Sequence, residues 1–277
     1  MALRINNNVP SIFAQKHMSR TQERLSSSFD HLSSGLRITK AADDAAGLGV
    51  SENLRSQLRS LRQAMRNTND GISVIQTAES ALGEIANNLM RMRQLAVQAA
   101  SEVLAATERG FLATEFSALQ TEIDRIANVS EFSGLQLANG TVASVAVQVG
   151  INNVTANDRI TVNFQNATTT GLAVTTALAA LTNATTSFAA IDVIDTALNS
   201  VNTSRSNYGA AQNSLSSALH NLESYTENLV AAESRIRDVD FAMETAELAR
   251  NTVFQQAGIA IMAQANQSSQ SALQLLQ

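Results

Sequence analysis

The side chains that could support chemistry are few and widely separated in this chain of 277 residues. The 3 histidines, His17, His31 and His220, each lie inside or beside a predicted helix. A metal site or an acid–base site needs several such groups converging in a cleft. The spacing therefore favours surface or interface packing for these side chains.

Aspartates occur in two close pairs, Asp43 with Asp44 in KAADDAAG, and Asp238 with Asp240 in RIRDVD. Paired carboxylates support general acid–base or metal chemistry when they converge in a cleft. Aspartates beside helix starts more commonly accept hydrogen bonds from free backbone N–H groups, or pair with arginine. We therefore expect N-caps or salt bridges to nearby arginines such as Arg37.

The composition excludes several classes of protein. Absence of cysteine excludes disulfides, thiolate zinc sites and a cysteine nucleophile. The net charge of −5 disfavours nucleic-acid binding, and no apolar run reaches the ~18 residues of a membrane span. No glycine-rich phosphate loop is present. We predict no enzyme activity, no catalytic, cofactor-binding or metal residues, no cofactor, no nucleic-acid partner and no membrane insertion.

The elements that must position these side chains are long helices, because Pro10 is the single proline. An apolar stripe in steps of four and three predicts one helix with a coiled-coil seam, and an extra step of three at Ala78 is the mark of a stammer. The stripe comprises Leu54, Leu58, Leu61, Met65, Thr68, Ile72, Ile75, Ala78, Leu82, Ile85, Leu89, Met92, Ala96 and Ala99.

A second stripe from Ile194 to Ile236 predicts the antiparallel partner, and a shorter one over 112–126 predicts a third helix. Segments 142–149 and 160–164 are rich in β-branched residues and flank a turn-forming stretch, so a β-hairpin is expected there. The predicted fold class is mainly α: a long antiparallel helical coiled-coil rod with a small β-hairpin region.

Charge is unevenly distributed along the chain. No ionisable side chain follows Arg250, and this neutral segment is too polar for lipid and too uncharged for a solvated helix. It is therefore expected to pack against other protein. Arg55, Arg59, Arg62 and Arg66 form a row on the first long helix, which is either a solvated face or an ionic seam to another subunit.

Several long motifs resemble those of the bacterial flagellin family, in the same order and over about four-fifths of the chain. The N-terminal motifs are HLSSGLRI at 31–38, AADDAAGL at 41–48, NDGIS at 69–73 and RMRQLAVQ at 91–98. The C-terminal motifs are GAAQN at 209–213, ENLVAAESRIRD at 227–238 and AQANQ at 263–267. The chain is similar to a short flagellin without large variable outer domains.

The resemblance implies a division of the chain. Residues 1–40 and 240–277 would form paired terminal helices lining the core of the filament, and 41–239 a rod-like helical domain, with the β-hairpin and a short variable surface loop in 140–190. The resemblance implies that the protein is a structural subunit, which polymerises into the bacterial flagellar filament for motility. Residues 1–10 lack the features of a secretory signal, which agrees with export by the flagellar type III apparatus.

The resemblance also implies partners and a location. The partners would be other flagellin subunits in a helical homopolymer, a flagellar export chaperone, and the cap and hook-junction proteins. The protein would be secreted and extracellular, in the bacterial flagellum. Many flagellins are recognised by Toll-like receptor 5 through an Arg, a Leu and a Glu, and the matching positions here are Arg91, Leu95 and Glu115.

The sequence leaves two other functions open. A hook–filament junction protein resembles flagellin at its ends, although the complete motifs at 227–238 and 263–267 favour flagellin. A non-flagellar coiled-coil interaction module would also show interrupted heptads, but it would not require an uncharged terminus of this length.

Overall fold

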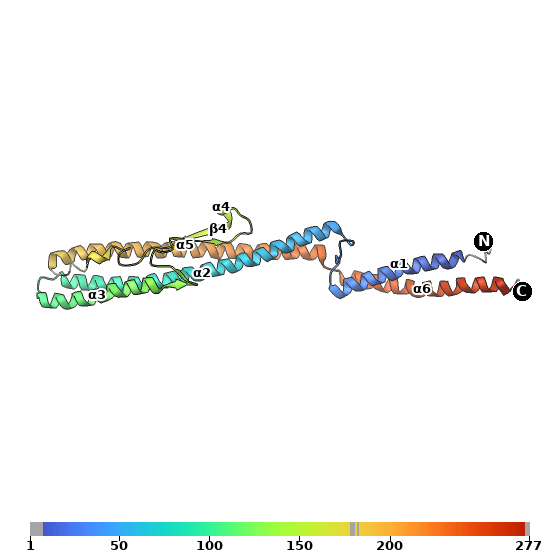
Figure 1. The fold of residues 1–277 in the computed structure, drawn as a ribbon, viewed down its shortest axis with the longest axis horizontal. Helices are drawn as coiled ribbons and strands as arrows, with labels where there is room; N and C mark the ends of the chain where they lie inside the picture. Colours follow the sequence, from blue (N-terminus) through green and yellow to red (C-terminus); the bar gives the residue numbers. More distant parts are fainter. Residues whose placement is uncertain (1–7, 178–180, 182, 275–277) are drawn as a thin grey trace. The chain divides into compact units, whose positions relative to one another are not determined.

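The computed structural model describes residues 8–177, 181 and 183–274, and long α-helices account for most of them (Figure 1). The long helices are α1 (Val9–Ser34), α2 (Ala45–Ala99), α3 (Ala106–Val129), α5 (Ala184–Arg237) and α6 (Phe241–Gln274). Two small antiparallel ribbons and two short helical turns complete the described elements. The predicted mainly α fold with long helices and a small hairpin region is confirmed.

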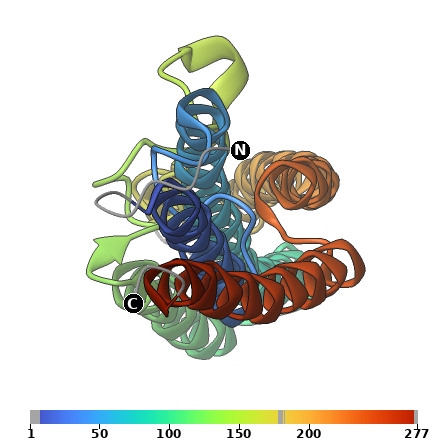
Figure 2. The same cartoon turned by 90° about the vertical axis from the view of Figure 1, so that its right-hand side faces the viewer.

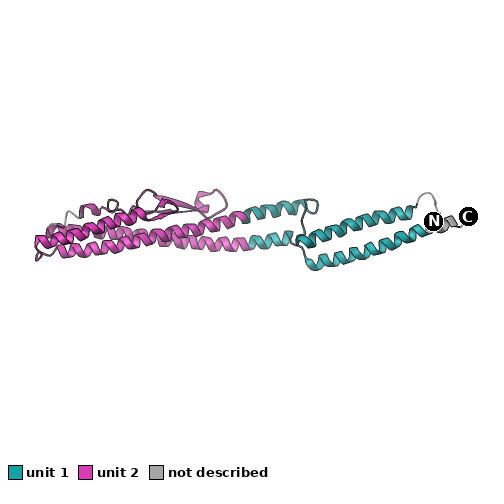
Figure 3. Cartoon of the chain, turned by 60° about the horizontal axis from the view of Figure 1, so that its bottom comes forward, with its two compact units in different colours: residues 1–58, 228–277 teal, residues 59–227 magenta. Residues whose placement is uncertain are grey.

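Compact packing divides the chain into two units, coloured in Figure 3. Unit 1 contains residues 1–58 and 228–277, and unit 2 contains residues 59–227. Helices α2 and α5 both contribute to each unit. The non-helical connectors 35–44 and 238–240 lie within unit 1, between its helices.

The apolar stripe of α2 is the buried side of this helix in unit 2. Ile75, Leu82, Ile85, Leu89 and Met92 are almost completely buried. The one polar member of the stripe, Thr68, is also buried, and its hydroxyl donates to the backbone carbonyl of Ala64 at 2.8 Å. The seam therefore contains no unsatisfied hydroxyl at this position, which explains why a threonine is tolerated there.

Helix α5 runs antiparallel to α2 in unit 2. Asp195 pairs with Arg93 and Arg205 with Glu79, so residue numbers rise along one helix as they fall along the other. Helix α3 packs on the same core through Phe116 and Ile123. The three predicted stripes therefore meet in one core, although α2 and α5 both begin earlier than the stripes do.

The hairpin of unit 2 is formed by β3 (Ser144–Gln148) and β4 (Arg159–Asn163), with Val145 opposite Val162 in its register. The turn between them contains α4 (Thr155–Asp158), a single helical turn that the sequence pattern does not predict. Val147 packs directly over Gly71 of α2, where an added Cβ would meet a Val147 methyl at 2.8 Å. The hairpin thus lies against α2 because this helix position has no side chain.

Two segments of unit 2 differ from the sequence prediction. A second ribbon, β1 (Glu131–Phe132) with β2 (Leu135–Gln136), follows α3 and turns at Gly134, whose φ is 82°. The stretch between β4 and α5, which includes η1 (Val174–Ala177), was expected to be a surface loop. Ala167 and Val174 are instead buried in the core, because Asp124 of α3 accepts hydrogen bonds from the backbone N–H and hydroxyl of Thr169 at 2.8 Å each.

In unit 1, α1 and α6 lie side by side and antiparallel, as Figures 1 and 2 show. Gln255 donates to Gln22 at 2.8 Å, and Asn8 donates to the carbonyl of Ala265 at 3.1 Å. The contact is close because small residues are buried in it, including Ser11 and Ser28. The larger side chain of Phe29 is exposed rather than buried.

Candidate functional surfaces

The aspartate pairs act as local caps and turns. Asp44 accepts from the N–H of Gly47 at 2.9 Å at the start of α2, and Asp240 accepts from the N–H groups of Ala242 and Met243 at the start of α6. These bonds satisfy N–H groups that a helix start leaves free. The N-cap interpretation of the aspartate motifs is therefore confirmed for Asp44 and Asp240.

His31 is the histidine with the most polar surroundings. Its imidazole lies 3.8 Å from an oxygen of Asp43 in the connector and 3.6 Å from an oxygen of Glu244 in α6. Asp43 accepts hydrogen bonds from the backbone N–H groups of Lys40 and Thr39, which lower the pKa of its carboxyl. Across the described ranges, no group of three or more His, Asp or Glu side chains is placed to hold a metal ion.

Two of the three residues matched to receptor recognition meet on the surface of unit 2. Arg91 of α2 contacts Glu115 of α3, with Nη2 at 2.6 Å and Nε at 2.8 Å from the same carboxylate oxygen. Both side chains are about half exposed, at 50% and 44%. Leu95 is only 1% exposed and belongs to the core beneath them. The structure therefore brings Arg91 and Glu115 together, and places Leu95 underneath the surface.

Helices α1 and α6 present many large apolar side chains outward. Phe13, Phe254 and Ile261 border an apolar groove of about 300 Å³ between the two helices. The exposed set is Val9, Ile12, Phe13, Phe29, Phe241, Met243, Val253, Phe254, Ile259 and Ile261. Contiguous exposed apolar side chains mark surfaces that contact other protein. The sequence predicts contact with other protein for the uncharged segment after Arg250, and the exposed apolar side chains of α6 after that residue agree with it.

The arginine row of α2 is divided by the structure. Arg55 pairs with Glu52 at 2.8 Å and lies 3.6 Å from Glu233, so its charge is used within unit 1. Arg59, Arg62 and Arg66 belong to unit 2 and are exposed. The predicted alternatives of a solvated face and an intersubunit seam therefore apply only to these three residues.

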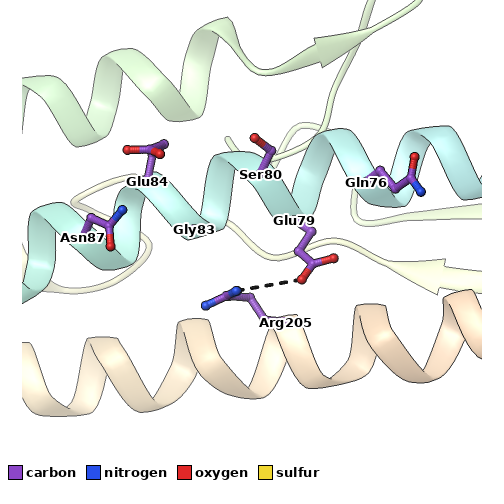
Figure 4. Close-up of a pocket in the computed structure, with 7 residues that line it drawn as sticks. All are labelled: Gln76, Glu79, Ser80, Gly83, Glu84, Asn87 and Arg205. Atoms are coloured by element: carbon purple, nitrogen blue, oxygen red, sulfur yellow. Dashed lines mark ion pairs between the residues drawn. The ribbon is translucent and has the colours of Figure 1, made fainter.

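A polar hollow of about 480 Å³ lies between α2 and α5 in unit 2, as Figure 4 shows. Glu79 and Glu84 of α2 and Arg205 of α5 line it, and Arg205 approaches Glu79 at 3.8 Å. The sequence pattern does not indicate this hollow, because its residues are the outward-facing positions of two helices.

None of the helices over the described ranges combines the length and apolar character that crossing a membrane requires.

Long helices with a buried seam and an outward apolar surface on paired end helices define a structural, assembly-forming class of protein. Family models match both ends of the chain. The bacterial flagellin N-terminal helical region matches residues 5–143, and the bacterial flagellin C-terminal helical region matches residues 191–276. The chain belongs to the bacterial flagellin family, whose members are structural proteins.

Individual relatives agree with the family models. A flagellin of Halalkalibacterium halodurans is 45% identical over 274 residues, covering 98% of this chain and 99% of that protein. A flagellin of Bacillus subtilis is 39% identical over 306 residues, covering 99% and 100%. A solved structure from Vibrio parahaemolyticus, described as a flagellar hook-associated protein, matches at a TM-score of 0.61 with 15% identity, covering 71% of this chain and 100% of that one. This last likeness concerns the fold alone.

Proposed function

We propose that this chain is a subunit that polymerises with other copies of itself into the bacterial flagellar filament. The observation that carries the proposal is the outward apolar surface of α1 and α6, combined with membership of the flagellin family. Burying this surface against neighbouring copies is favourable by about 25 cal/mol per Å² of apolar area. A head-to-tail contact that does not close on itself produces an open helical array.

The two terminal regions, residues 1–40 and 240–277, would line the core of the filament, and residues 41–239, with the hairpin and loop of 140–190, would surround them. Few of the described side chains of α1 and α6 are buried, and those of α1 are the small residues Ser11 and Ser28. Ordering two long helices costs more conformational entropy than such a contact recovers. In this proposal the terminal helices become fully ordered only when neighbouring copies cover them.

Deletion of residues 251–277 tests the assembly proposal. The truncated chain should remain soluble and helical but form no filaments, because one of the two apolar end surfaces is removed. Electron microscopy and sedimentation at increasing protein concentration would measure this, with the full chain as the control. Normal filaments from the truncated chain would contradict the proposal, and persistent dimers of the full chain would favour a coiled-coil interaction module instead.

The family also suggests how the chain reaches the filament. Export by the flagellar type III apparatus, with an export chaperone and with cap and hook-junction proteins as further partners, would place it outside the cell in the flagellum. Secretion of the chain by a flagellated bacterium, and its loss when the export apparatus is inactivated, would support this route.

A second function is recognition by Toll-like receptor 5 at the Arg91–Glu115 surface. The exposed ion pair supplies a charged contact, while Leu95 would act by supporting the surface from below. Arg91→Ala and Glu115→Ala should each weaken receptor binding by about tenfold or more if they are central contacts. Arg125→Ala is the matched control, because Arg125 pairs with Glu122 on the same helix as Glu115. Unchanged binding by both variants would contradict the proposal.

A further inference from the structure

Three arginines on one face of α2 carry charge that the described part of the chain does not neutralise. Arg59 and Arg62 are exposed and join none of the ion pairs among the described residues, and Arg66 contacts only the amide oxygen of Gln63. Arg55, one turn earlier, is by contrast paired with Glu52 and Glu233. The row that is free for an external partner therefore begins at Arg59.

The spacing of this row is unfavourable for the isolated chain. Steps of three and four place Arg59, Arg62 and Arg66 on one face over about 10 Å, at 1.5 Å per residue. Like charges at these spacings destabilise a helix by a few tenths of a kcal/mol per pair. An acidic surface laid along the row would offset this repulsion.

A ridge with a hollow on each flank lies further along the same helix. Gln76, Ser80 and Glu84 follow one another at steps of four and line both hollows, which have volumes of about 480 and 560 Å³. Gly83 lines the first hollow, and a Cβ placed there would meet no atom within 4 Å. The backbone of α2 is therefore open to close approach in this hollow.

The charge of the hollow is suited to a guanidinium group. Glu84 is exposed and forms no ion pair within the described ranges. Glu79 is held only loosely by Arg205, at 3.8 Å (Figure 4). Carboxylate and amide oxygens on neighbouring turns match the planar donor groups of arginine better than those of lysine.

We propose that the row Arg59–Arg62–Arg66 of one copy packs beside the ridge Gln76–Ser80–Glu84 of a second copy. The inference rests on the proposed polymerisation and adds a surface to it. Side-chain ridges of one helix fit the grooves of another, and here the two surfaces have opposite charge. One chain carries both surfaces, so in the head-to-tail array of the proposed function the same contact can repeat from copy to copy. A polyanion would match the row but would leave the acidic hollow unexplained.

Single charge reversals test the contact. Arg62→Glu and Glu84→Arg should each slow elongation from wild-type filament seeds by about tenfold, since each brings like charges together. The combined Arg62→Glu/Glu84→Arg chain restores opposite charges between its own copies, so it should elongate from seeds of the same combined chain within about twofold of the wild-type rate. Glu223→Arg is the matched control, because Glu223 forms an exposed pair with His220 elsewhere on α5.

The outcomes separate this inference from the proposed function. If the wild-type chain forms no filaments, the proposed function fails. If it does form filaments, but the single reversals elongate at the wild-type rate or the combined chain stays slow, the charged contact is overturned. Circular dichroism of each monomer checks that helicity is retained. Added salt should slow the wild type more than Arg62→Gln, because exposed charges are screened.

Discussion

At the scale of single residues, Asp43 organises the connector that follows α1. Its carboxylate accepts from the N–H groups of Thr39 and Lys40 and from the Thr39 hydroxyl, at 2.9 to 3.0 Å. His31 lies 3.8 Å from this carboxylate, and the neighbouring Lys40 is also held by Asp30 at 2.8 Å. The conformation of the connector therefore depends on the Asp43 carboxylate, which accepts these hydrogen bonds more strongly when it is ionised.

We predict an acid-sensitive contribution of Asp43 to stability. The backbone N–H bonds lower its folded pKa below the ordinary value of about 3.9, so its stabilising effect is present above that value and is lost as the pH falls through the folded pKa. Asp43→Asn should lower the melting temperature at neutral pH. The difference from wild type should shrink below about pH 4. A difference that stays constant down to about pH 2 would contradict this account.

The burial of Leu95 shows what residue patterns leave out. The stripe on α2 predicts Met92, Ala96 and Ala99 as buried, and all three are. A two-helix seam would leave Leu95 at its margin. Because both α3 and α5 pack on α2, the covered face is wider than a heptad seam, and it includes Leu95 and Ala81. The apolar period of one helix does not show how many other helices pack against it.

At the scale of elements, two glycines within helices differ in how much room an added side chain would have. Gly71 faces Val147 of the hairpin, whereas a Cβ at Gly209 of α5 would meet no atom within 4 Å. We predict that Gly209→Ala stabilises the chain by about 1 kcal/mol through helix propensity. Gly71→Ala should instead destabilise it by about 1–3 kcal/mol, because the hairpin must shift. Denaturant unfolding measures both, and equal effects would argue against close packing at Gly71.

The long helices could be predicted from sequence because their apolar period extends over many turns. The hairpin could be located because β-branched runs flank a turn. The ribbon at Gly134 could not, since two-residue strands have no period and depend on turn geometry. The burial of Val174 depends on the Asp124–Thr169 hydrogen bonds across a separation of 45 residues. The hollow beside Glu84 could not be predicted either, because it is formed by the packing of α2 against α5.

At the scale of the whole molecule, the two units differ in what holds them together. Unit 2 contains a large apolar core, exemplified by Ile85 and Leu215. In α1 and α6, the buried residues among those described are Ser11, Ser28 and Asn251, all of them polar. We predict that backbone amides in α1 exchange with solvent about a hundredfold faster than those of α2 in unit 2, because local opening exposes less apolar surface.

Hydrogen exchange of the monomer, read by mass spectrometry of peptides from each helix, measures this difference. The hairpin strands provide an internal reference within unit 2. Similar protection of α1 and α2 would show that the terminal pair is as stable as the core. Exchange of α1 should slow on assembly if neighbouring copies cover it.

The pairing of α1 with α6 also sets the order in which the molecule can be built. The hydrogen bond between Asn8 and Ala265 joins residues 257 apart, and the one between Gln22 and Gln255 joins residues 233 apart. Contacts at such separation carry the entropy of closing a long loop until the intervening chain has folded. Helix α1 is synthesised before α6 and therefore acquires this partner only after the long intervening chain has been made.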